Sequence, residues 1–367
     1  MDSAALFQPF TCKSLRLKNR IVMAPTARWA TPDGNPGPLA DYYRARVLGG
    51  ASLVMTEGAA INRPASYNDP RNFRIFGPAL EGWPKLVAAV HDAGGAIIPQ
   101  LWHAGSVAKK ASEWQPAGEP ESPSGLVSAG QPRGRAMTDA DLAAVLRAFV
   151  EAAEACVKFK LDGVEVHAGH GYLLDQFFWD QTNRRDDRWG GKTLAARASF
   201  PLEVVKTVRK TIGDELPLVL RISNWKSAGL DVRMFETPRE LEDWLAPFTV
   251  AGVDIFSVSM LRYDAPIFPD SPLSFAGWVK KVTGCPVIAA GGVGMSGDLI
   301  STFAGETGLP LRVDDVAHRI AAGEFDLVAV GRALVADPFW PQKIAEDRFG
   351  EICPCTPQQL APQLPLD

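Results

Sequence analysis

The segment 163–191 carries the densest set of residues in this chain that could do chemistry. It reads GVEVHAGHGYLLDQFFWDQTNRRDDRWGG, and His167, His170 and Tyr172 come directly after a short apolar run at 164–166. That run has the length and composition of a buried strand. Imidazole and phenol groups donate and accept hydrogen bonds and exchange protons. Three of them in one loop at a strand end indicate a site that binds an oxygen atom and moves a proton.

Apolar runs of strand length recur along the chain, with helix-length amphipathic segments between them. Their uniform apolarity predicts burial on both faces, as in a parallel sheet covered by helices. The expected strands are 21–25, 52–56, 96–101, 163–167, 218–222, 255–259, 286–290 and 327–330. Eight repeats of strand and helix favour an α/β fold of the closed kind, a (β/α)₈ barrel, over an open sheet.

The segments outside this repeat have separate interpretations. Residues 1–350 are predicted to form the single barrel, and we expect the Pro- and Gln-rich tail at 351–367 to be poorly ordered. Residues 11–20 predict a hairpin that closes the bottom of the barrel. The long insertion at 102–135 is expected to lie over the barrel mouth, and a second insertion spans 295–310. Thr138 and Asp141 predict a capping box at the start of a helix.

Composition excludes several kinds of partner. The chain has 367 residues, is 46% hydrophobic and carries a formal net charge of −4, with basic residues scattered among acids. We therefore expect no nucleic acid or membrane partner. No apolar run approaches the ~20 residues of a membrane span, and no signal peptide is recognisable. The cysteines have neither disulfide-framework density nor zinc-site spacing, which favours a reducing, cytoplasmic location.

Glycines and an arginine follow the last two expected strands, Gly291 and Gly292 after the seventh and Gly331 and Arg332 after the eighth. Barrels commonly bind phosphate there, because small residues let backbone N–H groups approach the oxygens and an arginine adds charge. Residues 292–297 also spell GxGxxG. We do not interpret this as a dinucleotide-binding fold, because the motif does not belong to a leading βαβ unit.

The strand ends resemble those of a known family. The similarity to the Old Yellow Enzyme family of FMN-dependent ene-reductases covers residues 6 to about 348 and lies in the motifs APTAR, EG, QLWHAG, HAGHGYLLDQF with NRRDDRWGG, LRIS, AAGG and VGRALVADP. The resemblance implies a barrel that holds FMN noncovalently and accepts electrons from NADH or NADPH. It also implies that the substrate is an α,β-unsaturated carbonyl compound, an enone, whose activated C=C bond is reduced.

The same resemblance implies roles for individual residues. His167 and His170 would bind the carbonyl oxygen, Tyr172 would donate the proton, and Trp29 and Trp102 would lie at the substrate. Gln100 would bond the pyrimidine part of the flavin, and Arg221 would favour the anionic reduced form. The full set implied to contact FMN is Ala24, Pro25, Thr26, Ala27, Gly58, Gln100, His167, Arg221, Gly291, Gly292, Gly331 and Arg332.

Side-chain chemistry agrees with these roles. Two imidazole N–H groups aimed at an oxygen that gains charge can contribute about 10²–10³ in rate each. A phenol with an ordinary pKa of about 10 keeps its proton at neutral pH and can act as the acid. Two positions depart from the family pattern. Ala27 replaces the usual Thr or Cys near the flavin C4 oxygen, and Ser106 replaces a frequent Arg.

Other functions stay open at this point. Because of Ala27, a second candidate is an FMN-dependent dehydrogenase or demethylase-like enzyme, which oxidises its substrate. A third candidate is a non-enzymatic flavin redox sensor. A metal-dependent hydrolase is disfavoured, because no carboxylate set completes a ligand sphere around His167 and His170. Cys353 and Cys355 are too few for an iron–sulfur cluster. A homo-oligomer is compatible with the sequence, which does not fix the oligomeric state.

Overall fold

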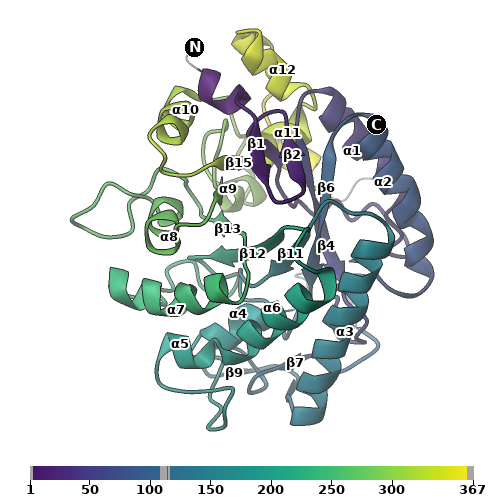
Figure 1. The fold of residues 1–367 in the computed structure, drawn as a ribbon, viewed down its shortest axis with the longest axis vertical. Helices are drawn as coiled ribbons and strands as arrows, with labels where there is room; N and C mark the ends of the chain where they lie inside the picture. The colour runs from purple at the N-terminus through teal and green to yellow at the C-terminus, as the bar shows by residue number, and fades with distance from the viewer. Residues whose placement is uncertain (1–2, 108–113, 115, 362–367) are drawn as a thin grey trace.

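Eight parallel strands close a barrel in the computed structural model, which describes residues 3–107, 114 and 116–361 (Figure 1). They are β3 (Ile21–Met23), β4 (Leu53–Ala60), β6 (Ala96–Trp102), β11 (Val164–His167), β12 (Leu218–Ser223), β13 (Ile255–Ser259), β14 (Val287–Ala290) and β15 (Leu327–Val330). Each strand pairs in parallel with the next, and β15 pairs with β3. The predicted (β/α)₈ barrel is therefore confirmed. A two-residue strand, β5 (Phe73–Arg74), adds to β4.

Helices lie around the outside of this barrel, as Figure 1 shows for α3, α6 and α7. The longer ones are α1 (Ala40–Leu48), α2 (Trp83–Asp92), α3 (Asp139–Lys158), α6 (Ser199–Ile212), α7 (Pro238–Val250), α8 (Phe275–Thr283) and α10 (Asp314–Ala321). The predicted capping box opens α3: the Thr138 side chain accepts from the Asp141 N–H, and the Asp141 carboxylate accepts from the Thr138 N–H. These bonds satisfy backbone donors that have no partner within the helix.

Shorter helices shape the loops. They are α4 (Leu173–Phe178), α5 (Leu194–Arg197), α9 (Leu299–Phe303), α11 (Arg332–Ala336), α12 (Trp340–Ala345) and α13 (Pro357–Leu360), with 3₁₀ turns η1 (Ala4–Phe7), η2 (Gly37–Leu39), η3 (Gly77–Gly82) and η4 (Phe349–Glu351). None of the helices in the described part of the chain is long and apolar enough to cross a membrane.

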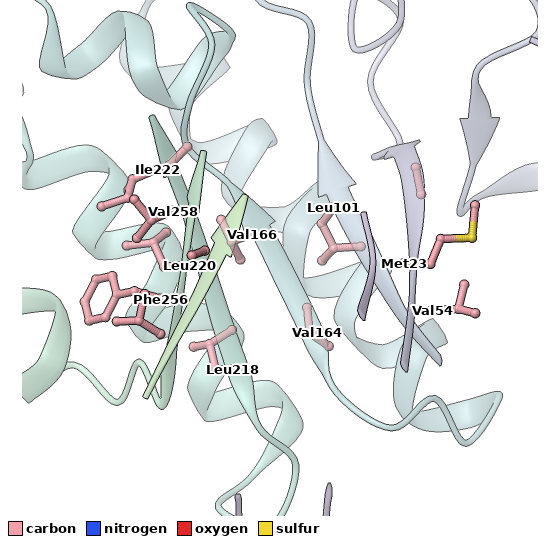
Figure 2. Close-up of a cluster of buried hydrophobic side chains, with 14 of the residues drawn as sticks. Met23, Val54, Leu101, Val164, Val166, Leu218, Leu220, Ile222, Phe256 and Val258 are labelled. Carbon is pink, nitrogen blue, oxygen red and sulfur yellow. The ribbon is translucent and has the colours of Figure 1, made fainter. Parts of the chain in front are cut away.

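Alternate residues of each strand pack on opposite sides of the barrel wall. Leu218, Leu220 and Ile222 of β12 contribute to the core beneath the helices, together with Val164 and Val166 of β11 (Figure 2). The residues between them point the other way, because successive side chains of a strand alternate in direction. This alternation turns polar residues near the carboxyl ends of the strands, such as Arg221, toward the barrel interior.

The predicted hairpin is present before the first barrel strand. β1 (Phe10–Cys12) and β2 (Leu15–Leu17) pair antiparallel. Phe10, Leu15 and Leu17 are buried in the cluster that fills the barrel interior, which also contains Val22 and Leu53. The hairpin therefore closes one end of the barrel with apolar side chains.

The long insertion and the tail contain short strands and buried contacts. The 102–135 segment contains β7 (Glu121–Ser122), β8 (Leu126–Ser128), β9 (Gln131–Pro132) and β10 (Arg135–Ala136), while 108–113 and 115 lie outside the described residues. Part of the tail, 353–361, contacts the rest of the chain. Cys355 and Leu360 are buried, and Arg28 Nη2 donates to Gln359 O at 2.7 Å. Residues 362–367 are outside the description.

Candidate active site

A cavity of about 560 Å³ lies at the carboxyl ends of the barrel strands. Its volume is typical of small-molecule sites, which span roughly 300–1,000 Å³. All residues that the sequence indicated for the site line this one cavity, namely Ala24, Pro25, Thr26, Ala27, Trp29, Gly58, Gln100, Trp102, His167, His170, Tyr172, Arg221, Gly291, Gly292, Gly331 and Arg332. The barrel brings them together because the carboxyl ends of parallel strands meet at one face.

The two histidines contact each other at the end of β11. His170 Nδ1 lies 3.2 Å from His167 Nε2, and the Gly169 N–H donates to His167 Nδ1 at 3.3 Å. In a neutral imidazole only one nitrogen carries a proton. His167 must therefore carry it on Nε2 and donate it to His170 Nδ1, which leaves the proton of His170 on Nε2. That atom is buried and has no hydrogen-bond partner among the described residues.

Burial controls the protonation of this loop. Burial and the nearby Arg221 charge hold the pKa of His167 well below its usual value. Burial, with smaller contributions from His167, Arg221 and Lys226, does the same to the pKa of His170. Burial raises the pKa of Tyr172. At neutral pH the loop therefore presents two neutral imidazoles and a protonated phenol.

Aromatic rings surround the three groups. The Tyr172 ring meets Trp102 edge to face at a centroid distance of 5.1 Å and His167 at 5.3 Å. On the other side, Trp225 lies 4.4 Å from the His170 ring. These rings exclude water from the donors and fix their orientation, which strengthens the electrostatic effect of each N–H or O–H group.

Polar side chains of the neighbouring strands form a second group inside the barrel. Gln100 Nε2 donates to Glu165 Oε2 at 2.7 Å, and Arg221 Nη1 donates to Ser257 Oγ at 3.0 Å. Burial raises the pKa of Glu165, which the Arg221 charge opposes. The bond to Glu165 orients the Gln100 amide, whose carbonyl oxygen can then accept from a ligand N–H. The sequence interpretation missed Glu165, although an acid within the apolar run VEV was a signal.

Glu57 was also missed as a site residue. It lines the cavity, is buried, and accepts the Arg28 N–H on Oε1 at 3.1 Å, while Oε2 has no partner among the described residues. Burial is the main cause that raises the pKa of Glu57 to about 8. The carboxyl group is therefore protonated at neutral pH and can donate into the cavity. Ser259 and Met260, at the end of β13, line the cavity as well and were not predicted.

The glycine end of the cavity leaves space beside the backbone. A Cβ at Gly291 would lie 2.5 Å from Met260 O, so only glycine fits. A Cβ at Gly292 or Gly331 would meet its nearest atom at an ordinary van der Waals distance, 3.5 Å or 3.7 Å, so the backbone there is less tightly covered than at Gly291. Arg332 donates to Ser296 O, Gly297 O and Thr302 Oγ1, which are neutral acceptors, and within the described residues it forms no ion pair. Its positive charge is therefore available to an anion.

Two neighbouring motifs have structural roles. His103 does not line the cavity; its Nε2 lies 3.2 Å from Glu121 Oε1, in a network with Arg63 and Arg135. The segment 183–191 makes structural contacts. Asn183 Nδ2 donates to Phe177 O and Trp189 O, so it ties this segment to the helix that follows the histidine loop.

The residues present fit FMN. The cavity combines apolar surfaces, an oriented amide at Gln100, a buried cation at Arg221, and a glycine-lined end beside the Arg332 charge. A flavin ring needs the first three features, and a phosphate monoester needs the fourth.

Comparison with known proteins decides the family. The model of the NADH:flavin oxidoreductase / NADH oxidase family matches residues 5–351. The chain belongs to this family. Membership confirms the family that the resemblance to Old Yellow Enzyme implied, and with it FMN as the cofactor of the barrel.

Individual relatives of the family agree. An NADH oxidase of Thermoanaerobacter brockii is 32% identical over 95% of this chain but 52% of its own length, so the chain spans about half of this relative. A metal reductase of Desulforamulus reducens is similarly covered by 50%, at 30% identity. An NADPH dehydrogenase of Geobacillus thermodenitrificans is 29% identical over 94% of this chain and 95% of its own length.

Among solved structures, the fold matches the Old Yellow Enzyme homologue from Zymomonas mobilis with a TM-score of 0.79 at 26% identity, covering 98% of this chain and 97% of that one. Morphinone reductase matches with a TM-score of 0.79 at 25% identity, covering 98% and 94%.

Proposed function

We propose that the chain is an NAD(P)H-dependent ene-reductase that reduces the C=C bond of α,β-unsaturated carbonyl compounds. The observation that carries the proposal is the histidine pair. It leaves one buried N–H group, on His170 Nε2, without a partner among the described residues, and both His170 and Tyr172 line the cavity. A neutral donor beside a protonated phenol suits a carbonyl oxygen that gains charge and a neighbouring carbon that gains a proton.

The predicted residues divide among the parts of FMN. Ala24, Pro25, Thr26, Ala27 and Gly58 would lie along the ring. Gln100 and Arg221 would bond its pyrimidine edge. The phosphate would lie at Gly291, Gly292, Gly331 and Arg332, where the structure leaves space and an unbalanced positive charge. Bound FMN supplies the hydride that it has taken from NADH or NADPH.

Of the two histidines expected at the carbonyl oxygen, His170 would bind it through Nε2–H, while His167 donates to His170 Nδ1 and would orient that ring. Addition of hydride to the β-carbon moves negative charge onto that oxygen, and one aimed N–H donor stabilises this charge by about 10²–10³ in rate. The lowered pKa values of His167 and His170 keep both imidazoles neutral at neutral pH. Neither ring therefore has to release a proton before a neutral substrate binds. Trp29 and Trp102 would border the substrate.

Tyr172 would then protonate the α-carbon. Its raised pKa keeps the proton on the phenol until the substrate carries an enolate, which is a strong enough base to take it. The edge-to-face contact with Trp102 holds the ring in place for this transfer.

Visible spectroscopy of the purified protein tests the proposal. We expect a yellow protein whose absorbance bleaches under anaerobic conditions on titration with NADH or NADPH and recovers when 2-cyclohexenone is added. Recovery with oxygen alone and none with any enone would exclude the ene-reductase reaction while leaving the flavoprotein intact.

Ala27 favours one second candidate. Its methyl group lines the cavity where a hydroxyl or thiol would tune the flavin potential, so an FMN-dependent dehydrogenase that oxidises its substrate is the alternative. Steady-state rates measured in both directions separate the two functions.

A further inference from the structure

A buried ion pair lies directly behind the histidine loop. Asp175 Oδ1 and Lys226 Nζ are 2.6 Å apart, and each side chain is only 1% exposed. Neither residue lines the cavity. Removing two charges from water costs free energy that their attraction often fails to offset, so a buried pair is weak evidence for a stabilising role. The contacts of this pair with the histidine loop indicate a role in positioning that loop instead.

The first of these contacts reaches the loop itself. Asp175 Oδ2 accepts a hydrogen bond from the Gly171 N–H at 2.6 Å. Gly171 has φ +81°, and His170 has φ +61°, a left-handed conformation that is unfavourable for a residue with a Cβ. The carboxylate therefore helps to hold the backbone at His170 in a conformation that the chain would not maintain by itself.

Lys226 connects the same point to a second loop. Its backbone forms a parallel bridge with His170, and both Ser227 N and Ser227 Oγ donate to His170 O, at 3.1 Å and 2.8 Å. The preceding residue, Trp225, is the one that packs on the His170 ring. Because Trp225 and Ser227 line the cavity, the ion pair joins two cavity-lining loops at the position of His170.

We propose that Asp175 and Lys226 are positioning residues, whose ion pair fixes the backbone of His170 and Gly171 so that the free His170 Nε2–H points at the carbonyl oxygen of the substrate. The pair touches neither substrate nor FMN and acts through His170. This inference rests on the proposed carbonyl site, but its effect on the His170 ring can be measured without turnover.

The chain offers a matched control pair. Lys280 Nζ lies 2.6 Å from Asp326 Oδ2, and Asp326 Oδ2 also accepts a backbone N–H, that of Val287, at 2.8 Å. Val287 begins β14, so this pair lies at the end of the strand opposite the cavity. Lys280→Met removes the same kind of charge as Lys226→Met, from a site that is more exposed, at 27% and 19%.

The experiment measures binding of 4-nitrophenolate, whose anionic oxygen represents the charged carbonyl oxygen, to the FMN-loaded enzyme. We expect Lys226→Met to raise the dissociation constant about tenfold or more, because a small misplacement of a donor loses much of its effect. Lys280→Met should leave it unchanged. Lys226→Met leaves the Asp175 carboxylate buried without its cation, so its melting temperature should fall. The double variant Asp175→Asn/Lys226→Met carries no unpaired buried charge. Its melting temperature should therefore return toward that of the wild type, while its dissociation constant stays raised. Recovery of both would overturn the positioning role, as would unchanged binding in Lys226→Met.

Ring NMR of the histidines provides a readout that is independent of ligand. The chain has only 5 histidines, so the His170 signals can be assigned by substitution. We expect the wild type and Lys280→Met to show the same His170 Nε2–H signal, and Lys226→Met to shift or broaden it. An unchanged signal in Lys226→Met would refute the inference. Absence of enone turnover in the wild type, with the NMR difference present, would instead refute the proposed function alone.

Discussion

At the scale of single residues, Tyr172 is the most direct test of the proposed chemistry. Tyr172→Phe removes the phenolic proton but keeps the ring that packs on Trp102. We expect reoxidation of the reduced enzyme by an enone to slow by about 10²-fold or more, and flavin reduction by NADPH to be spared. Stopped-flow absorbance measures both half-reactions. Tyr263→Phe, outside the cavity, is the control, and unchanged reoxidation in Tyr172→Phe would remove Tyr172 from the acid role.

A second residue-scale prediction concerns Glu57 and pH. The folded protein raises the pKa of Glu57 from the usual 4.5 to about 8, so folded protein binds this proton more tightly than unfolded protein does. The stabilising contribution is complete below pH 4.5 and is lost as the pH rises through about 8. Glu57→Gln should abolish this fall, which is on the order of a few kcal/mol, because the amide stays neutral.

Urea unfolding of wild type and Glu57→Gln across this pH window measures the difference. The amide oxygen of the variant can still accept the Arg28 N–H, so the loop contact is retained. Parallel pH profiles for the two proteins would show that Glu57 ionises normally in the fold.

At the scale of elements, α3 depends on its capping box. Thr138→Ala removes the hydroxyl that accepts from the Asp141 N–H and leaves that donor without a side-chain partner. We expect a loss of about 1 kcal/mol in the free energy of unfolding. Thr138→Ser keeps the hydroxyl and should lose much less, as chemical denaturation can show. Equal losses in both variants would assign the effect to packing of the threonine methyl group.

At the scale of the whole molecule, the barrel separates stability from function. The β1–β2 hairpin fills the end of the barrel away from the cavity, with Leu15 only 2% exposed. Leu15→Ala should therefore cost roughly 2–5 kcal/mol of stability, from lost burial and the remaining void. FMN affinity and kcat of the folded enzyme should not change, because activity in such barrels resides at the other face.

The matched control for this prediction is Val250→Ala, since Val250 on α7 is 90% exposed and its truncation should change neither property. Thermal unfolding and fluorescence titration with FMN measure the two quantities separately. A loss of FMN affinity in Leu15→Ala that exceeds the loss of folded protein would show that the two ends of the barrel are coupled.

The sequence by itself determined the barrel and most of the polar residues that its cavity brings together. Strand-length apolar runs repeat eight times, and closing them must bring the carboxyl ends of the strands to one face, so His167, Arg221 and Gly331 meet whatever the details of packing. The apolar runs also predicted strands whose bounds the structure shifts by only a few residues.

Only the tertiary structure decided which polar groups are buried and what they contact. Glu57 and Glu165 are buried because of the direction in which their strands turn these side chains. The end of the described tail is held by the burial of Leu360. The Asp175–Lys226 pair joins side chains that are 51 residues apart, one on the short helix α4 and one in the loop after β12. Strand periodicity fixes where a strand ends, but the path of a loop depends on the sum of its contacts, so this pairing could be found only in the folded chain.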